Sequence, residues 1–371
     1  MATLMVAPFA PSDGSGSGLR TVGIARALAR LDDLEVAYVE FGDTRVAPAL
    51  EADPRIRLQA LRASRGAGRV LAYARARLAG TPRAFARGVS PELLFRSDEL
   101  ARFERVIAVE PTVAAALVLV SRNPGVVYNA SNLEHRFRPR FSHAKREYGS
   151  PAKLLEFERR ILARSLETWL PTRAEVRQAL DLVPDANVRY VPNVVDVRAI
   201  TTVAPSIEAS RILFVADFSY EPNQHAASLL VEDVMPRLWR RVPGARLTLV
   251  GRSLQLPVQD ARVEALGFVD KLADAYSSAT CVVVPLLEGG GSPLKLVEAF
   301  AYGMPVVATG RAAASLDGAV NGTHYLEAND ADALAEALAE VLTGAYGELG
   351  RNGRRLVESG YSIEALVEHL R

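Results

Sequence analysis

The segment from Cys281 to Thr309 reads C-V-V-V-P-L-L-E-G-G-G-S-P-L-K-L-V-E-A-F-A-Y-G-M-P-V-V-A-T. Its first run is apolar and rich in β-branched residues, which predicts a buried strand, and the run after Gly303 predicts a second one. Between them, Ser292 and Pro293 are a typical N-cap and first helical residue, so we predict a helix from Pro293 to near Gly303. Strand, helix and strand in this order predict a parallel α/β sheet.

The same alternation occurs on both sides of this segment. Further apolar runs begin near residue 3 and at Leu34, Arg105, Gly125, Arg211 and Arg246. The stretch from Val197 to Ser210 shows no periodicity, so we place a linker there, and 371 residues exceed the usual size of one core. We predict two doubly wound, Rossmann-like α/β domains, residues 1–197 and 198–355, which face a central cleft. A C-terminal helix over 356–371 is expected to cross back to the first domain.

The loop before the predicted helix has the features of an anion site. Its three glycines let the backbone approach a ligand, and a helix N-terminus directs amide groups and the positive end of its dipole toward it. We therefore predict that this loop contacts a ligand such as a diphosphate through Gly290, Gly291, Ser292, Pro293 and Leu294.

Lys295 and Glu298 are the candidate catalytic residues. A cation in the first turn opposes the helix dipole by a few tenths to about 1 kcal/mol, and a bound phosphate would reverse that sign. Glu298 follows three residues later on the same helical face. We interpret Lys295 as a phosphate ligand, solvent-facing in the free protein, and Glu298 as a ribose ligand. The alternative is a tight glycine turn in which a solvated Lys295 merely pairs with Glu298.

This loop resembles the G-G-G-x-x-x-K-x-x-E-A element of a subgroup of family 4 of the retaining GT-B glycosyltransferases. The resemblance extends in the same order to Y-V-P-N-V-V-D from Tyr190, F-V-A-D-F-S-Y-E-P-N from Phe214, L-T-L-V-G-R from Leu247 and L-G-F-V-D from Leu266. It implies the GT-B fold and a retaining, metal-independent hexosyltransferase. The donor would be a nucleotide sugar, with a UDP-sugar favoured, bound as a substrate and not as a cofactor.

Other site residues are implied by the same resemblance. Phe268 and Val269 would read the nucleobase through their backbone, or else they simply pack at a strand end. The donor would also contact Asn223 and Arg252. Apart from the resemblance, the loop G-S-G-S-G of the first domain precedes a helix expected near Leu19, and its Gly16 and Gly18 are expected to lie against the sugar or phosphate from the opposite wall of the cleft.

Two elements depart from the family pattern. The commoner E-x7-E loop requires an acid where Gly290 stands, and Glu288, two positions earlier, is a candidate on the acceptor side. Y-N-A-S-N-L-E-H, from Tyr128, resembles the H-N-x-E element with a serine in the place of the histidine. The acceptor-side candidates there are Asn132, Glu134 and His135, and the alternative is an ordinary polar loop.

Composition excludes several function classes. A net charge of +1 argues against nucleic acid as a partner. The single cysteine, Cys281, lies in an apolar run and is expected to be a core thiol, and the N-terminus lacks the pattern of a signal peptide. We expect a cytoplasmic protein with no metal site. No apolar run is long enough to span a bilayer, so membrane contact is at most peripheral.

One basic stretch is not explained by these assignments. It contains Arg62, Arg65, Arg69, Arg75, Arg77, Arg83 and Arg87. Such a stretch could bind an anionic acceptor or a membrane surface, but a solvated helical face is the favoured interpretation.

Together these features predict transfer of a sugar to the hydroxyl of a small-molecule or glycan acceptor, in secondary-metabolite or cell-surface glycan biosynthesis. Two alternatives remain open. One is a nucleotide-sugar epimerase on the same fold, and the other is a noncatalytic nucleotide-sugar-binding partner of another transferase.

Overall fold

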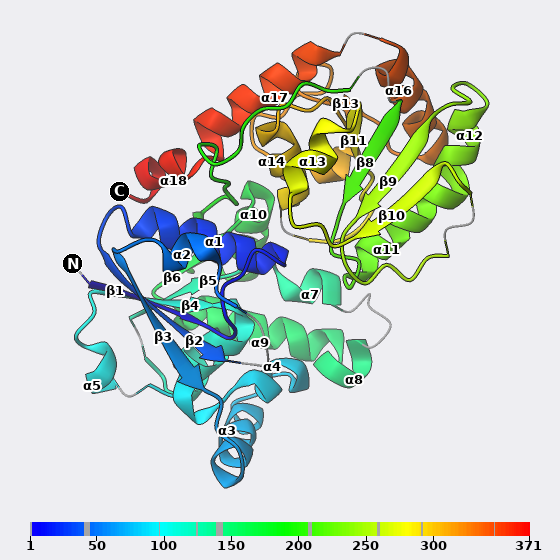
Figure 1. Ribbon diagram of the computed structural model, residues 1–371. Helices are drawn as coiled ribbons and strands as arrows, with labels where there is room; N and C mark the ends of the chain where they lie inside the picture. Colours follow the sequence, from blue (N-terminus) through cyan, green and yellow to red (C-terminus); the bar gives the residue numbers. More distant parts are fainter. Residues whose placement is uncertain are drawn as a thin grey trace. The chain divides into compact units, whose positions relative to one another are not determined.

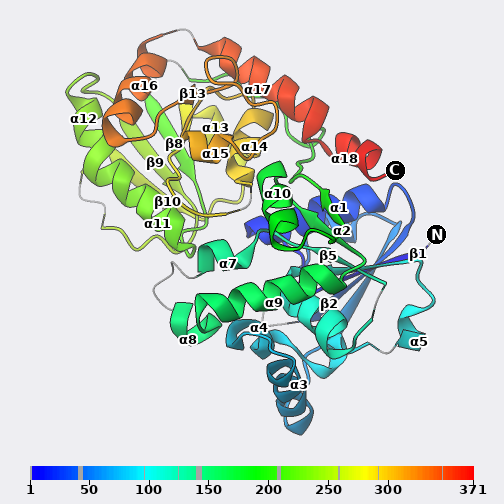
Figure 2. The same ribbon diagram turned by 180° about the vertical axis from the view of Figure 1, so that it is seen from behind.

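A computed structural model describes residues 2–40, 45–95, 97–123, 125–138, 144–206, 210–257, 260–290, 292–344 and 346–371. The chain folds into two compact units. Unit 1 comprises residues 1–192 and 366–371, and unit 2 comprises residues 193–365. Figures 1 and 2 show a parallel sheet with helices around it in each unit.

Unit 1 is built on a seven-stranded sheet in the order β3-β2-β1-β4-β5-β6-β7. The strands are β1 (Ala2–Ala7), β2 (Asp33–Glu40), β3 (Ile56–Arg62), β4 (Arg105–Val109), β5 (Val126–Asn129), β6 (Glu167–Leu170) and β7 (Val188–Tyr190). Every pairing is parallel, with Met5 of β1 opposite Val36 of β2 and Ile107 of β4. The strand order reverses between β1 and β4, so the loops after these two strands leave the sheet at a topological switch point, where such sheets bind ligands.

The helices of unit 1 connect these strands. They are α1 (Gly16–Leu28), α2 (Pro48–Glu51), α3 (Ala67–Leu78), α4 (Arg83–Gly88), η1 (Pro91–Leu93), α5 (Ser97–Leu100), α6 (Glu110–Ala114), η2 (Ala115–Val120), α7 (Glu134–Phe137), α8 (Ala144–Tyr148), α9 (Pro151–Arg164) and α10 (Arg173–Leu182). The η2 segment is π-helical and continues α6. Its apolar side chains join those of β4, β5 and α9 in one buried core.

Unit 2 contains a six-stranded parallel sheet in the order β10-β9-β8-β11-β12-β13. Its strands are β8 (Arg211–Val215), β9 (Arg246–Val250), β10 (Val263–Gly267), β11 (Cys281–Val284), β12 (Val306–Ala308) and β13 (Leu326–Glu327). Its helices are α11 (Glu221–Ser228), η5 (Leu229–Val234), α12 (Met235–Trp239), α13 (Leu272–Ser277), α14 (Leu294–Ala301), α15 (Gly310–Ala313), α16 (Ala331–Thr343) and α17 (Gly347–Gly360), followed by α18 (Ile363–Leu370).

The alternation of side chains along β8 separates two cores in unit 2. Ile212 and Phe214 point into one core with α11, α12 and α16, whereas Leu213 points into the other with α13, α14 and α17. Helices therefore cover both faces of the sheet, as a doubly wound fold requires. Cys281 is fully buried in this sheet, and burial raises the pKa of its thiol to about 12, as expected for a core thiol.

The unit boundaries differ from the predicted ones. Val195 bridges to Ser362, and its N–H donates to the carbonyl of Tyr361 at 2.9 Å, so this stretch groups with unit 2 and not with unit 1. At the C-terminus two helices, α17 and α18, stand where one was predicted. Only residues 366–371 group with unit 1, where the His369 ring contacts the carbonyl of Tyr190.

Candidate functional site

Helix α14 begins at Leu294, one residue later than predicted, with Pro293 in extended conformation as its N-cap. Ser292 therefore precedes the cap, and its predicted capping role is wrong. The residue is 8% exposed, and its hydroxyl has no hydrogen-bond partner among the described residues. Its carbonyl accepts a 2.8 Å hydrogen bond from the Asn193 side chain, which fixes the loop in front of the helix. A buried polar atom without a partner is costly, and a ligand can satisfy it.

The prediction that Lys295 faces solvent is wrong. Its side chain is half-buried, and its ammonium donates to the amide oxygen of Asn223 on α11. The same ammonium lies 5.4 Å from the centre of the Phe214 ring. Burial lowers the pKa of Lys295 to about 7, although nearby Asp217 acts in the opposite direction. The partner of Lys295 is thus Asn223 and not Glu298, so the sequence-based alternative of a Lys295–Glu298 pair is not what the structure contains.

The loop after β8 organises the surroundings of Lys295. The carbonyl of Asp217 accepts a 2.6 Å hydrogen bond from the Asn223 amide, which orients the amide oxygen toward Lys295. The carboxylate of Asp217 accepts from Arg252 at 2.8 Å and from the hydroxyl of Ser219 at 2.6 Å. Burial alone would raise the pKa of Asp217, but these hydrogen bonds outweigh it and lower the pKa. Asn223 thus contacts the first turn of α14 directly, and Arg252 from the loop after β9 is linked to it through Asp217. That these two residues contact the donor stays a prediction.

Glu298 of α14 is half-buried and contacts a tyrosine of α13. The Tyr276 hydroxyl donates to its carboxylate at 3.4 Å, and the Tyr276 ring stacks on Tyr302 with centroids 4.1 Å apart. Burial, with the negative charge of Glu298 added, raises the pKa of Tyr276 well above its ordinary value. This hydroxyl therefore stays protonated and orients one carboxylate oxygen.

At Gly289 the glycine loop adopts a backbone conformation that requires glycine. Gly289 has φ of 109°, and a Cβ there would lie 3.2 Å from the Tyr220 hydroxyl. Its carbonyl accepts a 2.7 Å hydrogen bond from Arg311. Gly290 is half-buried in this loop, and Gly291 lies outside the described residues. The carboxylate of Glu288, the acceptor-side candidate of this loop, pairs with the ring of His225 on α11.

The predicted nucleobase rim lies at the end of β10. Phe268 is 69% exposed, whereas Val269 packs on the core beneath the sheet. The alternative in which both side chains merely pack at a strand end therefore fails for Phe268. Gly267, just before them, accepts from the Gly251 N–H at 2.8 Å.

The glycine-rich loop of unit 1 passes directly into α1. Helix α1 begins at Gly16, three residues before the expected Leu19, because Ser15 caps it by accepting from the Gly18 N–H at 3.2 Å. A Cβ on Gly18 would lie 2.2 Å from the carbonyl oxygen of Ser12, so this glycine is required for loop packing. A Cβ on Gly16 would meet nothing within 4 Å.

The acceptor-side candidates of unit 1 belong to a network of buried charges after β5. Glu134 is 2% exposed and pairs with Arg138, yet burial raises the pKa of Glu134 to about 7. His135 is held by Glu158, whose carboxylate contacts both its ring and its backbone N–H. Glu134 and His135 are thus occupied by protein partners. The side-chain oxygen of Asn132, by contrast, is buried without a hydrogen-bond partner among the described residues.

Glu110 is the residue of this region that the sequence did not reveal. It follows β4 at the switch point and adopts φ of 66°, a left-handed conformation that is unfavourable for a side chain with a Cβ. The hydroxyl of Ser131, which stands at the histidine position of the H-N-x-E element, donates to the Glu110 carboxylate at 2.5 Å. Burial raises the pKa of Glu110, while Ser131, Arg138 and Arg20 oppose the shift. Only the strained backbone at the end of β4 marks Glu110 as unusual, and this strain cannot be recognised from a sequence pattern.

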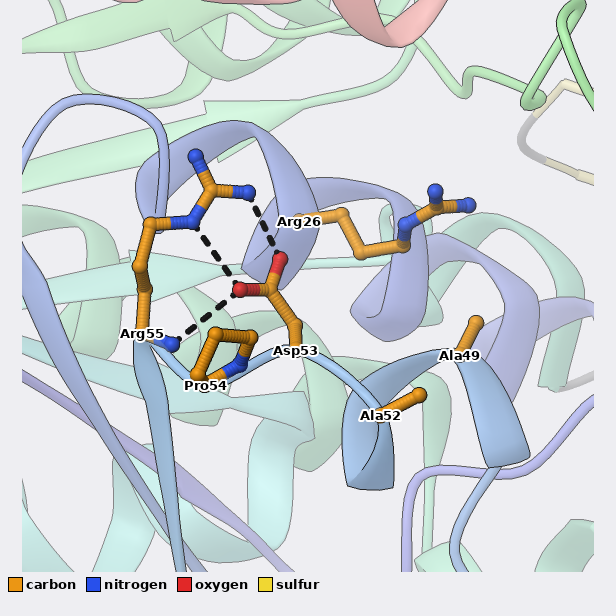
Figure 3. Close-up of a pocket in the computed structure, with 6 residues that line it drawn as sticks. All are labelled: Arg26, Ala49, Ala52, Asp53, Pro54 and Arg55. Atoms are coloured by element: carbon orange, nitrogen blue, oxygen red, sulfur yellow. Dashed lines mark hydrogen bonds and ion pairs between the residues drawn. The ribbon is translucent and has the colours of Figure 1, made fainter.

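Figure 3 shows a separate hollow of about 490 Å³ near the start of β3. Arg55 forms two hydrogen bonds with the Asp53 side chain there, at 2.9 and 2.8 Å, and Arg26 lies opposite. None of the sequence-predicted site residues lines this hollow. Asp53 and Arg55 neutralise each other at its wall, so we do not assign it a ligand.

Within the described residues, no group of three or more His, Cys, Asp or Glu side chains is placed to hold a metal ion. None of the described helices combines the length and apolar character needed to cross a membrane.

Comparison with known proteins supports the assignment of unit 2. Residues 209–344 match the family model described as Glycosyl transferases group 1. No curated protein matches the chain in sequence.

Solved structures resemble the chain over its whole length. Anabaena HepE with UDP is 14% identical, with a TM-score of 0.70 over 100% of this chain and 98% of that one. Sucrose-phosphate synthase from Thermosynechococcus elongatus is 18% identical, with a TM-score of 0.73 over 100% and 97%. A TarM mutant of S. aureus, crystallised with UDP among other ligands, is 10% identical, with a TM-score of 0.71 over 100% and 99%. At these identities the likeness concerns the fold. The chain thus has the GT-B fold, and its residues 209–344, which carry Asn223, Lys295 and Glu298, match the family model of the Glycosyl transferases group 1.

Proposed function

We propose that the protein transfers a hexose from a nucleoside diphosphate sugar to an acceptor hydroxyl, with retention of configuration and without a metal ion. The observation that carries the proposal is the first turn of α14. There a lysine is held against the helix dipole beside a buried serine hydroxyl that lacks a partner among the described residues. Such a site is unfavourable when empty and favourable with an anion bound.

The diphosphate would lie in front of α14. Lys295, the loop amides and the Ser292 hydroxyl would stabilise the negative charge that develops on the departing diphosphate, in the manner of an oxyanion hole. Arg252 would add positive charge if it exchanged Asp217 for a phosphate. Glu298 would accept hydrogen bonds from the ribose hydroxyls, and the backbone around Phe268 and Val269 would contact the base. The retaining stereochemistry rests on the family resemblance.

UDP is the favoured nucleotide because HepE and TarM have been crystallised with it. In the proposed reaction, the bond between the anomeric carbon and the diphosphate breaks as the acceptor oxygen bonds to that carbon. The acceptor proton would leave with the diphosphate or pass to a base. We place the acceptor against unit 1, at Glu110, Ser131 and Asn132, where one buried oxygen still lacks a partner among the described residues.

The test is a donor screen with purified protein, analysed by mass spectrometry. A panel of UDP-, GDP- and dTDP-hexoses is incubated with pooled small-molecule and glycan acceptors in the presence of EDTA. The proposal expects mass gain on an acceptor together with release of the nucleoside diphosphate. An isomerised donor formed without any acceptor would identify an epimerase instead. Tight donor binding without turnover in any mixture would identify a noncatalytic binding partner.

A further inference from the structure

The stretch from Pro54 to Pro91 has an unusual charge balance. It contains nine arginines and no aspartate, glutamate or lysine, although the whole chain has a net charge of only +1. The rest of the chain is therefore net acidic. Positive charge of this kind, gathered in one segment, attracts anionic surfaces and is screened by salt.

Helix α3 lies within this stretch and presents apolar side chains to solvent. Val70, Leu71 and Leu78 are 67%, 58% and 89% exposed. At 3.6 residues per turn, these three side chains fall within an arc of about 100° around the helix. We call them the α3 apolar face. Figures 1 and 2 both show α3 at the margin of unit 1, projecting past α4.

The opposite side of α3 is the one that packs on the protein. Ala72 and Ala76 are buried in the unit 1 core, and the helix contacts α4 and η2. Arg160 anchors the C-terminal end of the helix by donating to the Ala79 carbonyl at 2.7 Å. Alanines thus face the core while the larger apolar side chains face outward, the reverse of the usual arrangement for a surface helix.

Arginines border the α3 apolar face. On the same helical projection, Arg75 and Arg77 lie about 40° and about 20° beyond its two edges. Arg62, Arg65 and Arg83 are also exposed, and they form no ion pair with the residues that the structure describes. An exposed apolar stripe between arginines is typical of a helix that lies in a membrane interface.

The apolar surface continues into a hollow of about 610 Å³ next to the end of α3. Its apolar lining includes Leu78, Leu94, Phe95 and Leu119, and its charged lining consists of Arg75, Arg122 and one acidic residue, Asp98. The two guanidinium groups suit a phosphate headgroup, and the apolar lining suits an acyl chain.

We propose that α3 docks unit 1 on an anionic lipid bilayer, with Val70, Leu71 and Leu78 inserted among the acyl chains and the neighbouring arginines at the headgroups. The proposal takes up the membrane alternative for the basic stretch in place of the solvated face favoured from the sequence. A soluble polyanion would leave the three apolar side chains in water. A second copy of the chain would bring arginines against arginines. A bilayer with anionic headgroups matches both the charge and the apolar face.

The first experiment is sedimentation of the full-length protein with vesicles. One set contains phosphatidylcholine alone, and the other contains about 30 mol % phosphatidylglycerol, which supplies the negative surface. We expect binding to the anionic set only, weakened by added salt. No binding to either set, or equal binding to both, would overturn the proposal.

Two sets of variants separate the contribution of arginine charge to vesicle binding from that of apolar insertion. Val70→Ser, Leu71→Ser and Leu78→Ser together should reduce the bound fraction at least about tenfold, as should Arg65→Gln, Arg75→Gln and Arg83→Gln together. Matched controls in unit 2 are Val320→Ser with Leu287→Ser, and Arg240→Gln with Arg355→Gln. Circular dichroism checks folding, and all changed side chains are exposed. Loss with the arginine set alone would indicate electrostatic adsorption to the headgroups and would overturn insertion.

A fluorescent label measures insertion directly. Cys281 is fully buried, so an environment-sensitive maleimide dye added to Leu71→Cys labels the introduced thiol selectively. The emission of the dye at Leu71→Cys should shift to the blue when anionic vesicles are added. The same dye on Val320→Cys should show no shift. An unshifted spectrum at Leu71→Cys, with the protein demonstrably bound, would show that α3 does not insert.

Discussion

The Lys295 ammonium and the Asn223 amide are in hydrogen-bond contact, although 72 residues separate them in sequence. Asn223 is 5% exposed and is itself fixed by its bond to the Asp217 carbonyl. Lys295 is therefore held in place before any ligand arrives, at the cost of a lowered pKa. Preorganised charge of this kind is what electrostatic catalysis requires.

The first prediction concerns the charge of Lys295. Lys295→Ala should lower turnover by about 10² or more, the usual scale for losing one preorganised donor. Folding should persist, because the charged form of this half-buried lysine is disfavoured in the free protein. Initial rates of nucleotide release give the measurement, and exposed Lys271→Ala is the control. Activity of Lys295→Ala within a few-fold of the wild type would refute the assignment.

The second prediction is a pH dependence of nucleotide binding. With the Lys295 pKa at about 7 in the free protein, the ammonium loses its proton as the pH rises above that value. A diphosphate prefers the ammonium, so the Kd for UDP should increase by up to about tenfold per pH unit above 7. Calorimetry between about pH 7 and about pH 9 measures this slope. Lys295→Arg, which stays charged, should give a flat profile, and a flat profile for the wild type would contradict the proposal.

The lowered pKa of Lys295 also makes the stability of the free protein depend on pH. Stability should rise with pH, whereas the affinity for UDP should fall. The unfolded lysine keeps its proton up to its ordinary pKa of 10.5, whereas the folded one releases it near 7. Between these values the unfolded chain binds more protons, so this residue's contribution to stability increases as the pH rises through the window. Thermal unfolding of wild type and Lys295→Met should show the difference in slope.

Glu298 gives the third prediction. Glu298→Ala should weaken UDP binding at least about tenfold, because charged hydrogen-bond acceptors contribute roughly 1.5–3 kcal/mol each. Tyr276→Phe keeps the stack on Tyr302 and removes only the orienting hydroxyl, so its effect should be a few-fold. Exposed Glu336→Ala serves as the control. An unchanged Kd for Glu298→Ala would leave this residue with a structural role only.

The fourth prediction concerns the close approach of two loops. Gly251 has φ of 141°, and a Cβ there would lie 1.7 Å from the Ala216 carbonyl oxygen. Gly251→Ala should lower the free energy of unfolding by about 3 kcal/mol or more, or prevent folding, because backbone strain and overpacking add. At Gly244 a Cβ would meet nothing within 4 Å, so Gly244→Ala should be tolerated. Equal melting temperatures for the two variants would contradict this account.

The fifth prediction tests whether the strain at Glu110 serves function. Glu110→Gly relieves a left-handed conformation that costs about 1 kcal/mol or more, but it also removes the carboxylate that faces Ser131, Arg138 and the buried Arg20, so the net change in stability should be small. Turnover should nevertheless fall, with the larger change in the acceptor KM. Ser210→Gly relieves a similar conformation, φ of 43°, outside the site and should leave turnover unchanged. Wild-type kinetics in Glu110→Gly would remove this residue from the acceptor site.

Local patterns predicted the fold well because periodicity and turn residues act over a few neighbours. The segment from Cys281 to Thr309 forms strand, loop, helix and strand as expected, and the two doubly wound sheets are confirmed. The pattern misplaced the N-cap of α14 by one residue, because Ser292 and Pro293 are both residue types that are common at helix starts.

Long-range contacts could not be predicted from the sequence. Nothing near Lys295 indicates that Asn223 and Phe214 would surround it, or that the pKa of its ammonium would fall. Likewise, Glu110 looks like an ordinary residue after a strand, and only the backbone conformation and the Ser131 hydroxyl distinguish it. These properties depend on which strand ends become neighbours in the sheet.

The grouping of residues 366–371 with unit 1 has a consequence for protein engineering. A chimera that takes its two units from different proteins of this fold would, by the simplest design, use a single crossover after residue 192. The chain instead leaves unit 1 once and returns to it at Leu366, where Arg189 and Tyr190 contact His369. A functional chimera should therefore need two crossovers, so that the last six residues come from the same parent as the first 192.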